Sequence, residues 1–171
     1  MGTFSKTIYP ALRIGYLVVP RSLFSPLRIL AAELYRGGHL LEQKALAVFI
    51  REGHYEAHIR RMRLLYGKRR AYLVDLIHRY LGPEFVHEYS HDSGLHLVMK
   101  LPEQCDDVAI ASKALERGIK VRPLSQYYMH SHARAQRGLL MGFACVNERD
   151  MVMSFGVLLQ CLREAGVPTV N

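Results

Sequence analysis

The side chains best suited to covalent chemistry lie close to the N-terminus. Ser5, Lys6 and Arg13 fall within nine residues of one another. A lysine amine can form a Schiff base with a carbonyl compound, while hydroxyl and guanidinium groups can hold a phosphate. Pro10 stiffens the intervening loop, and Gly15 permits a close backbone approach. Taken as spacing alone, a surface lysine beside a structural arginine is the more common explanation.

The elements around these residues can be predicted from composition. The apolar, β-rich run 13–20 ends at a proline and predicts a buried strand. Residues 22–35 and 39–52 have helix-forming composition, and the Arg-Gly-Gly sequence at 36–38 breaks between them. We therefore expect a loop that carries the lysine, then a strand, then two helices.

A long helix is predicted next. From Tyr55 to Tyr80, apolar residues recur at alternating steps of four and three, and Arg69 is the one polar residue in that series. This pattern predicts one amphipathic helix of about 28 residues, roughly 42 Å long. A helix of that length is typical of a strut that connects two bodies.

The remainder of the chain alternates between predicted strands and helices. Gly118 is a candidate helix C-cap, and Asn147 is a candidate N-cap. The pattern indicates an α/β or α+β fold. The expected elements are strands at 95–101, 119–121 and 139–144, and helices at 106–117 and 147–165.

Composition excludes several classes of protein. The 171 residues, half of them hydrophobic, suffice for a substantial core, and no apolar run is long enough to span a bilayer. We expect a soluble, cytoplasmic protein with no membrane partner. Three widely spaced cysteines indicate neither a disulfide framework nor a zinc site. The formal charge of +8 favours contact with phosphates but says little about fold.

Two other features could suggest binding sites. The basic run at 60–70 could be a nucleic-acid-binding helix, but at helical spacing its charges spread around the axis, which favours a solvated or inter-subunit surface. The histidine pairs His91 with His96 and His130 with His132 lack the spacing of a recognised metal site. We interpret them as scattered histidines, and His96 as a residue that could face a ligand cleft.

The string from Gly2 to Pro20, Gly-Thr-Phe-Ser-Lys-Thr-Ile-Tyr-Pro-Ala-Leu-Arg-Ile-Gly-Tyr-Leu-Val-Val-Pro, is similar to the lysine segment of MocR-type regulators of the GntR family and of their aminotransferase relatives. The resemblance continues in the family's order over nearly the whole chain. It reappears at 63–70, 93–97, 118–128 and 138–144.

The resemblance implies an α/β fold, the C-terminal part of a fold-type I aminotransferase that depends on pyridoxal 5'-phosphate (PLP). Residues 1–53 would be the end of the PLP-binding large domain, 54–82 the long connecting helix and 83–171 the small C-terminal subdomain. Lys6 would be the catalytic, Schiff-base lysine, while Ser5 and Arg13 would contact the phosphate. The intact protein would be a homodimer.

Two departures from the family bear on function. The family's DNA-binding winged helix and the first part of its aminotransferase-like region would precede Lys6, so we expect DNA contact only through a domain absent from this sequence. Leu140 stands where relatives that bind an amino acid often place an arginine for the substrate carboxylate, although the nearby Arg137 could take that role.

We therefore expect an aminotransferase-like effector domain of a transcriptional regulator, responding to PLP or to an amino-acid-like effector. Two alternatives stay open. One is a fragment of a catalytically active class I/II aminotransferase, in which Lys6 would also transfer protons. The other is a truncated product without independent ligand function.

Overall fold

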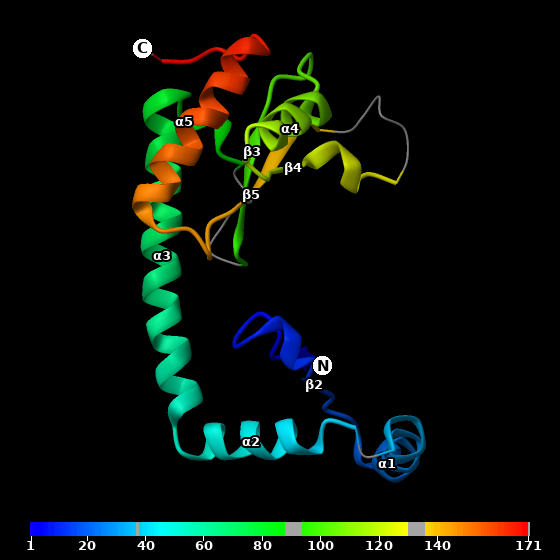
Figure 1. Cartoon of the computed structure of the whole chain (residues 1–171). Coiled ribbons are helices and arrows are strands. Elements are labelled where there is room, and N and C mark those ends of the chain that lie inside the picture. The colour runs from blue at the N-terminus through cyan, green and yellow to red at the C-terminus, as the bar shows by residue number, and fades with distance from the viewer. Residues whose placement is uncertain (37, 88–93, 130–135, 171) are drawn as a thin grey trace. The chain divides into compact units, whose positions relative to one another are not determined.

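The computed structural model describes residues 1–36, 38–87, 94–129 and 136–170. The chain divides into two compact units, residues 1–62 and residues 63–171. We call these the N-terminal unit and the C-terminal unit. The division falls within α3 (His54–Tyr80), the long helix in Figure 1. Its 27 residues confirm the single long helix that the apolar periodicity predicted.

The N-terminal unit begins with two short strands and a helical turn. β1 (Gly2–Thr3) pairs antiparallel with β2 (Gly15–Tyr16), and η1 (Pro10–Leu12) lies in the connection between them. Two predicted helices follow, α1 (Arg21–Tyr35) and α2 (Leu40–Arg51). Their bounds agree with the sequence prediction to within a residue at each end.

The prediction of a buried strand over 13–20 was wrong in extent and in burial. Only Gly15 and Tyr16 form β2, and the side chains that follow, Leu17 and Val18, are exposed. The reason is pairing: the strand partner of β2 within the described part of this unit is the two-residue β1. Ile14 alone of this run is buried.

The C-terminal unit is built on a three-stranded antiparallel sheet in the order β3-β5-β4. β3 (His96–Lys100) pairs along its whole length with β5 (Gly138–Gly142), and β4 (Arg122–Pro123) pairs with the middle of β5. Alternate side chains of β3 and β5 point to the core, as period-two burial requires. The buried cross-strand pairs are Leu97 with Met141 and Met99 with Leu139.

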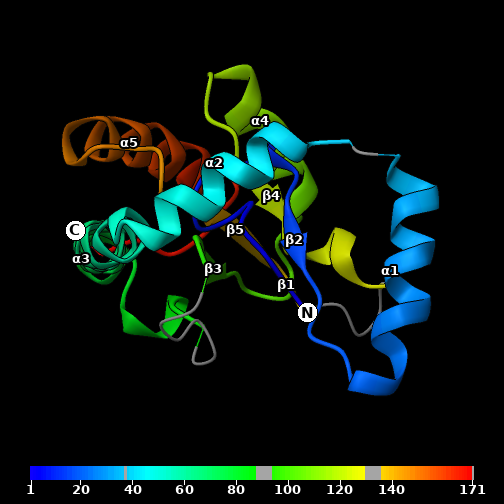
Figure 2. The same cartoon turned by 90° about the horizontal axis from the view of Figure 1, so that it is seen from below.

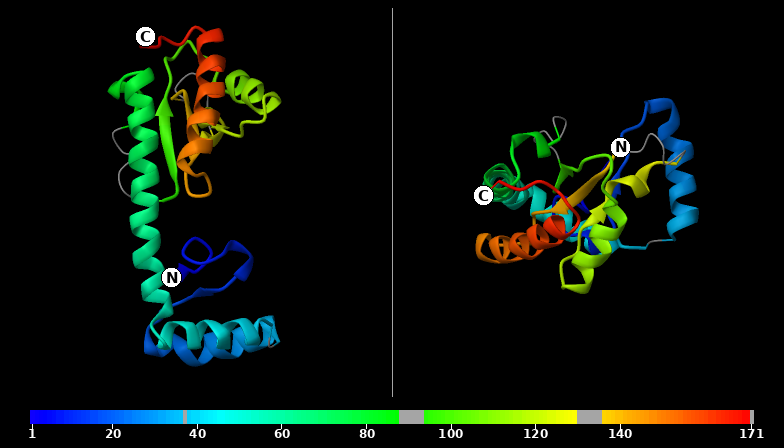
Figure 3. Two further views of the ribbon diagram at one scale, coloured as in Figure 1. Left: turned by 60° about the vertical axis from the view of Figure 1, so that its left-hand side comes forward. Right: turned by 90° about the horizontal axis from the view of Figure 1, so that it is seen from above.

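Helices complete this core. α4 (Asp107–Glu116) and α5 (Glu148–Glu164) contact each other and lie on the same side of the sheet (Figures 2 and 3). The second half of α3 contributes Leu73, Leu76 and Ile77. Short 3₁₀ turns, η2 (Pro83–Phe85) and η3 (Leu124–Tyr127), close the edges. Among the described residues, no helix has the length and apolar character needed to cross a membrane.

Helix caps follow the sequence prediction. The side chain of Asn147 accepts a hydrogen bond from the Asp150 backbone N–H at 2.9 Å, which starts α5. Gly118 follows α4 with φ of +83°, a conformation that favours glycine. Because the Ile119 N–H still bonds to the Ala114 carbonyl at 2.8 Å, the strand expected at 119–121 begins later, as β4.

Arg69 is the polar residue that interrupts the apolar face of α3. Its guanidinium donates a hydrogen bond to the carbonyl oxygen of Ala144, just beyond β5. The charge therefore satisfies a backbone acceptor 75 positions away along the chain. The neighbouring Lys68 forms an ion pair with Glu148 at the start of α5.

Candidate functional site

Lys6 lies in a turn whose backbone is fixed by the carbonyl oxygen of Phe4. That oxygen accepts hydrogen bonds from the backbone N–H groups of Thr7, at 3.2 Å, and Ile8, at 2.9 Å, and from the Thr7 hydroxyl at 3.2 Å. The Phe4 N–H in turn donates to the carbonyl of Ile14 at 3.0 Å. The turn is therefore tied directly to the segment that enters β2.

The two glycines of the strand pair explain how the ends of this loop approach each other. A Cβ atom at Gly15 would lie 2.9 Å from the Gly2 carbonyl oxygen, closer than real contacts allow. A Cβ atom at Gly2 would lie 2.6 Å from the Tyr16 ring. The predicted close backbone approach at Gly15 is confirmed.

Side chains from α3 hold the same turn from outside. The Phe4 ring packs against Tyr55 edge-on, with centroids 5.7 Å apart, and against Tyr16 at 5.6 Å. His58 Nε2 lies 2.9 Å from the Thr7 carbonyl oxygen. Since a carbonyl only accepts, Nε2 must carry the proton. The residues on both sides of Lys6 are thus anchored.

The candidate side chains Lys6 and Arg13 are accessible, and Ser5 is partly exposed. Lys6 and Arg13 are exposed, and neither side chain makes a hydrogen bond or ion pair with any residue that the structure describes. The Thr3 hydroxyl donates a hydrogen bond to the Ser5 hydroxyl at 3.1 Å, and Thr3 Oγ1 accepts one from the Ser5 N–H at 3.2 Å. Arg13 has φ of +51°, in the left-handed region. A cation, an amine and a hydroxyl therefore stand on one braced loop.

An open hollow borders Arg13. Its volume is about 530 Å³, and α1 supplies much of its apolar wall, including Leu27, Leu30 and Leu34. Gly15 and Tyr16 also line it. The loop that carries Lys6 therefore lies beside a large concave surface within the N-terminal unit.

In the C-terminal unit, Leu140 lies on the half-exposed face of β5. Its partner across β4 is Arg122, and its partner across β3 is Val98. The Arg122 guanidinium is exposed and donates to the Tyr127 hydroxyl at 3.3 Å. This hydrogen bond raises the pKa of Arg122 further. A guanidinium is thus present on this sheet face, one strand away from position 140.

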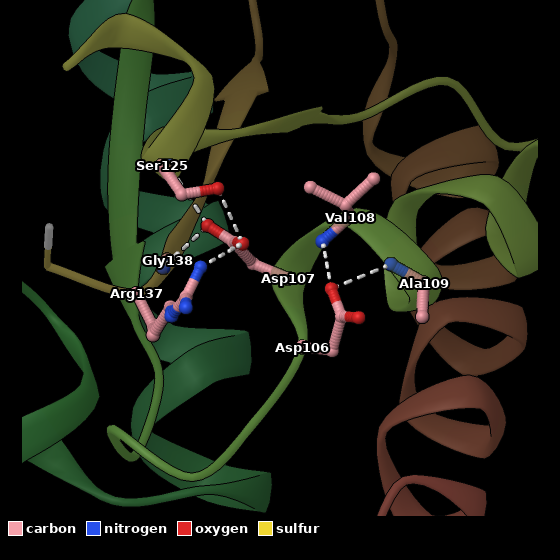
Figure 4. A network of polar contacts seen from close by, with 7 residues as sticks. All are labelled: Asp106, Asp107, Val108, Ala109, Ser125, Arg137 and Gly138. Atoms are coloured by element: carbon pink, nitrogen blue, oxygen red, sulfur yellow. Dashed lines mark hydrogen bonds and ion pairs between the residues drawn. The ribbon is translucent and has the colours of Figure 1, made fainter. Parts of the chain in front are cut away.

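Arg137, the other candidate for a carboxylate-binding arginine, is engaged elsewhere. Its Nη1 lies 3.5 Å from a carboxylate oxygen of Asp107, which is completely buried (Figure 4). Asp107 also accepts from the Ser125 hydroxyl at 2.7 Å, the Ser125 N–H at 2.9 Å and the Gly138 N–H at 3.3 Å. Arg137 therefore compensates a buried charge.

Sequence reasoning did not identify the Asp107 network. The preceding Asp106 gave a recognisable signal, since its side chain caps α4 through the N–H groups of Val108 and Ala109, both at 3.0 Å (Figure 4). Two adjacent aspartates thus have different structural roles. One caps the helix, and the other joins the helix to η3 and to the start of β5.

The histidines form no metal site in the part of the chain that the structure describes. His91, His130 and His132 lie outside the described residues. His96 is exposed at the start of β3, beside Gly142. The basic residues of α3 are partly paired, since Arg60 binds Glu56 and Arg61 Nη2 lies 3.5 Å from the ring of His58.

Comparison with known proteins now gives this arrangement a family. Residues 1–147 match the family model of aminotransferase class I and II. The chain belongs to this aminotransferase class I and II family. It is 36% identical over 151 residues to the "Probable rhizopine catabolism regulatory protein MocR" of Rhizobium meliloti, covering 88% of this chain and 30% of that protein.

Two further similarities bear on function and fold. The chain is 34% identical over 151 residues to the HTH-type transcriptional regulator YdeL of Bacillus subtilis, covering 88% of this chain and 32% of that regulator. The structure resembles LysN, an α-aminoadipate aminotransferase of Thermus thermophilus solved with N-(5'-phosphopyridoxyl)-L-leucine. The TM-score is 0.79 at 18% identity, over 95% of this chain and 41% of LysN.

These similarities confirm the fold-type I aminotransferase architecture and the likeness to MocR-type regulators that the sequence predicted. The chain spans about a third of the length of the curated relatives it matches.

Proposed function

We propose that this chain is the PLP-binding part of a cytoplasmic transcriptional regulator of the MocR type, with Lys6 as the residue that bonds covalently to the cofactor. The main support for this proposal is the geometry of the loop that contains Lys6. Its backbone is fixed by Phe4, Thr7 and His58, while its amine makes no bond to any described residue. An amine held in this way is available to an aldehyde ligand.

The donor set fits the proposed cofactor. PLP supplies an aldehyde and a ring that withdraws electrons, together with a phosphate dianion. In this proposal Arg13, an unpaired guanidinium, and the Ser5 hydroxyl hold the phosphate. The boundaries proposed from the sequence, 1–53 for the end of the large domain, 54–82 for the connecting helix and 83–171 for the small subdomain, belong to the same proposal. So does a homodimeric intact protein that contacts DNA through another domain.

The C-terminal unit favours an effector-binding role over transamination. Leu140 cannot bind a carboxylate, and Arg137 is paired with Asp107. Among the described residues, Arg122 places a guanidinium on the same sheet face as Leu140, and it donates a hydrogen bond to the Tyr127 hydroxyl. We propose that a carboxylate-bearing effector is held there, which gives recognition without the arginine position that active relatives use.

The test is an absorbance titration of the purified chain with PLP, followed by borohydride reduction and peptide mass spectrometry. We expect a saturable absorbance change and an adduct confined to the Lys6 peptide. Lys6→Ala should lose both. Lys44→Ala is the matched control, since Lys44 is also exposed and makes no bond to the described residues.

Other outcomes favour the alternatives. Adducts spread over several lysines would contradict a specific site. Release of an oxo acid from an amino acid, lost in Lys6→Ala, would favour the active aminotransferase. No adduct at any concentration would favour a product without independent ligand function.

A further inference from the structure

The C-terminal unit contains a second hollow, separate from the Lys6 loop. Its volume is about 270 Å³, and its residues come from the second half of α3, the connection after α4, β5 and α5. The inner wall consists of buried apolar side chains, among them Leu73, Met141, Phe155 and Leu158. Nothing in the site proposed for PLP uses this hollow.

Three of the residues that line the hollow are small. Gly118 and Gly142 have no side chains, and Ser154 projects only a hydroxymethyl group from α5. A Cβ atom at Gly118 would meet nothing within 4 Å, and one at Gly142 would meet only the His96 ring, at 3.6 Å. The surrounding side chains therefore leave this space unfilled.

One cation stands at the rim. Lys120 is exposed and makes no hydrogen bond or ion pair with the residues that the structure describes. The acidic side chains of α5 have their own partners, and Asp150 accepts a hydrogen bond from the Asn147 side chain. Glu148 pairs with Lys68, and Glu164 pairs with Lys113 and Arg117. The Lys120 ammonium is therefore available to an anion from outside the chain.

An apolar hollow with an unpaired cation at its rim selects amphipathic anions. A dry cavity of about 150 Å³ can hold a benzene molecule. The present volume of about 270 Å³ accommodates a ring with a short chain. Met141 and Met151 in the wall can adapt to differently shaped ligands. We propose that this hollow binds a small carboxylic acid with an apolar body, its carboxylate on Lys120 and its body against Met141 and Phe155.

The methionines allow a direct test with the full chain. Two of the seven methionines, Met141 and Met151, line the hollow, whereas Met99 is buried in the core outside its lining. In a chain labelled with ¹³C at the methionine methyls, titration with 4-phenylbutyrate should shift the methyl NMR signals of Met141 and Met151 saturably. The methyl signals of Met99 and Met62 should not shift. PLP is not required, so the outcome is independent of the proposed function.

Two variants separate the charge from the cavity. Lys120→Gln should weaken 4-phenylbutyrate binding about two- to fivefold, as expected for an accessible ion pair, and leave 4-phenylbutanol binding unchanged. Ser154→Leu should abolish binding of both ligands by filling the hollow from α5, and leucine is a good helix former. Lys44→Gln, the same change on α2 in the other unit, is the control and should change neither affinity.

Several outcomes would overturn the proposal. The first is the absence of a saturable shift at Met141 and Met151 in the folded chain. Another is equal affinity of wild type and Lys120→Gln for the acid. Undiminished binding to a folded Ser154→Leu chain would place the ligand elsewhere.

Discussion

Arg122 lies directly opposite Leu140 in the β4–β5 pair, so the two side chains share one face of the sheet. From the family resemblance, we expect relatives that bind an amino acid to carry an arginine at position 140. In this chain, such an arginine would stand against a guanidinium that is already fixed by Tyr127. Like charges directly opposite each other in a strand pair are destabilising. An arginine at 140 facing Arg122 would therefore be unfavourable, whereas leucine at 140 brings no such repulsion.

Leu140→Arg should consequently destabilise the C-terminal unit by about 0.5–1 kcal/mol. The loss should be recovered when Arg122→Gln is added, because the facing cation is then removed. Urea unfolding of wild type, both single variants and the double variant measures this coupling. Additive single-variant losses would show that the two positions do not interact.

A second prediction concerns how much the buried carboxylate of Asp107 contributes to the stability of the C-terminal unit. Asp107→Ala leaves Arg137 and the Ser125 hydroxyl without their partner and should cost about 3–5 kcal/mol. Ser125→Ala removes one donor and should cost about 1–2 kcal/mol. Asp106→Ala is the matched control, since it removes only the helix cap, at about 1 kcal/mol. If Asp107→Ala costs no more than Asp106→Ala in chemical unfolding, the network contributes little.

Glu164 gives the C-terminal unit a defined acid dependence. Hydrogen bonds from Lys113 and Arg117 hold the pKa of this carboxyl below its usual range. A lowered pKa in the folded state means stability that is present above the unfolded value of about 4.3 and lost as the pH falls through the folded value. Glu164→Gln should therefore lower the melting temperature slightly at pH 7 and have no effect near pH 2.

The control for this pH profile is Glu116→Gln on α4. Glu116 is exposed and makes no ion pair with the described residues. The melting temperature of the Glu116→Gln variant should therefore equal that of wild type at every pH. A constant offset between Glu164→Gln and wild type down to pH 2 would contradict the assignment to ionisation.

The elements that follow local rules could be predicted from the sequence. The apolar period of α3, the Asn147 cap and the position of Gly118 each depend on residues only a few positions apart. The Lys6 loop could be identified as a candidate site because its lysine, serine and arginine are close in sequence. The contact that holds this loop could not be predicted, because His58 and the Thr7 carbonyl are 51 positions apart and no local pattern encodes their contact.

Two failures have a common physical cause. The run at 13–20 has the composition of a buried strand, but burial depends on which partner strands are present, and among the described residues the strand partner is β1. Asp107 resembles any acidic residue in the first turn of a helix. Its burial arises because residues 18 and 31 positions later, Ser125 and Gly138, fold back onto it.

The thiols should differ sharply in reactivity. Cys145 is exposed, whereas Cys105 and Cys161 are buried, and burial raises the pKa of the Cys105 thiol. Because the thiolate is the reactive form, we expect iodoacetamide at pH 8 to label Cys145 first. Mass spectrometry of digests over time measures this order, and labelling in urea should make all three equivalent. Early labelling of Cys161 in the native protein would contradict its burial.

α1 should be the least protected long helix of the chain. None of its residues is buried, and Pro26 within it cannot donate a backbone hydrogen bond. α5, by contrast, buries six residues from Met151 to Leu162. Since local opening is easiest where few apolar groups are buried, α1 amides should exchange with deuterium much faster than α5 amides. Peptide-resolved exchange measures both helices in one sample, and α5 serves as the internal reference.

Equal protection would mean that the exposed Leu23, Phe24 and Leu34 side chains are covered in solution, as they would be in a self-associated chain. Dilution would then distinguish the two cases, because protection by self-association decreases with concentration and intrinsic helix stability does not.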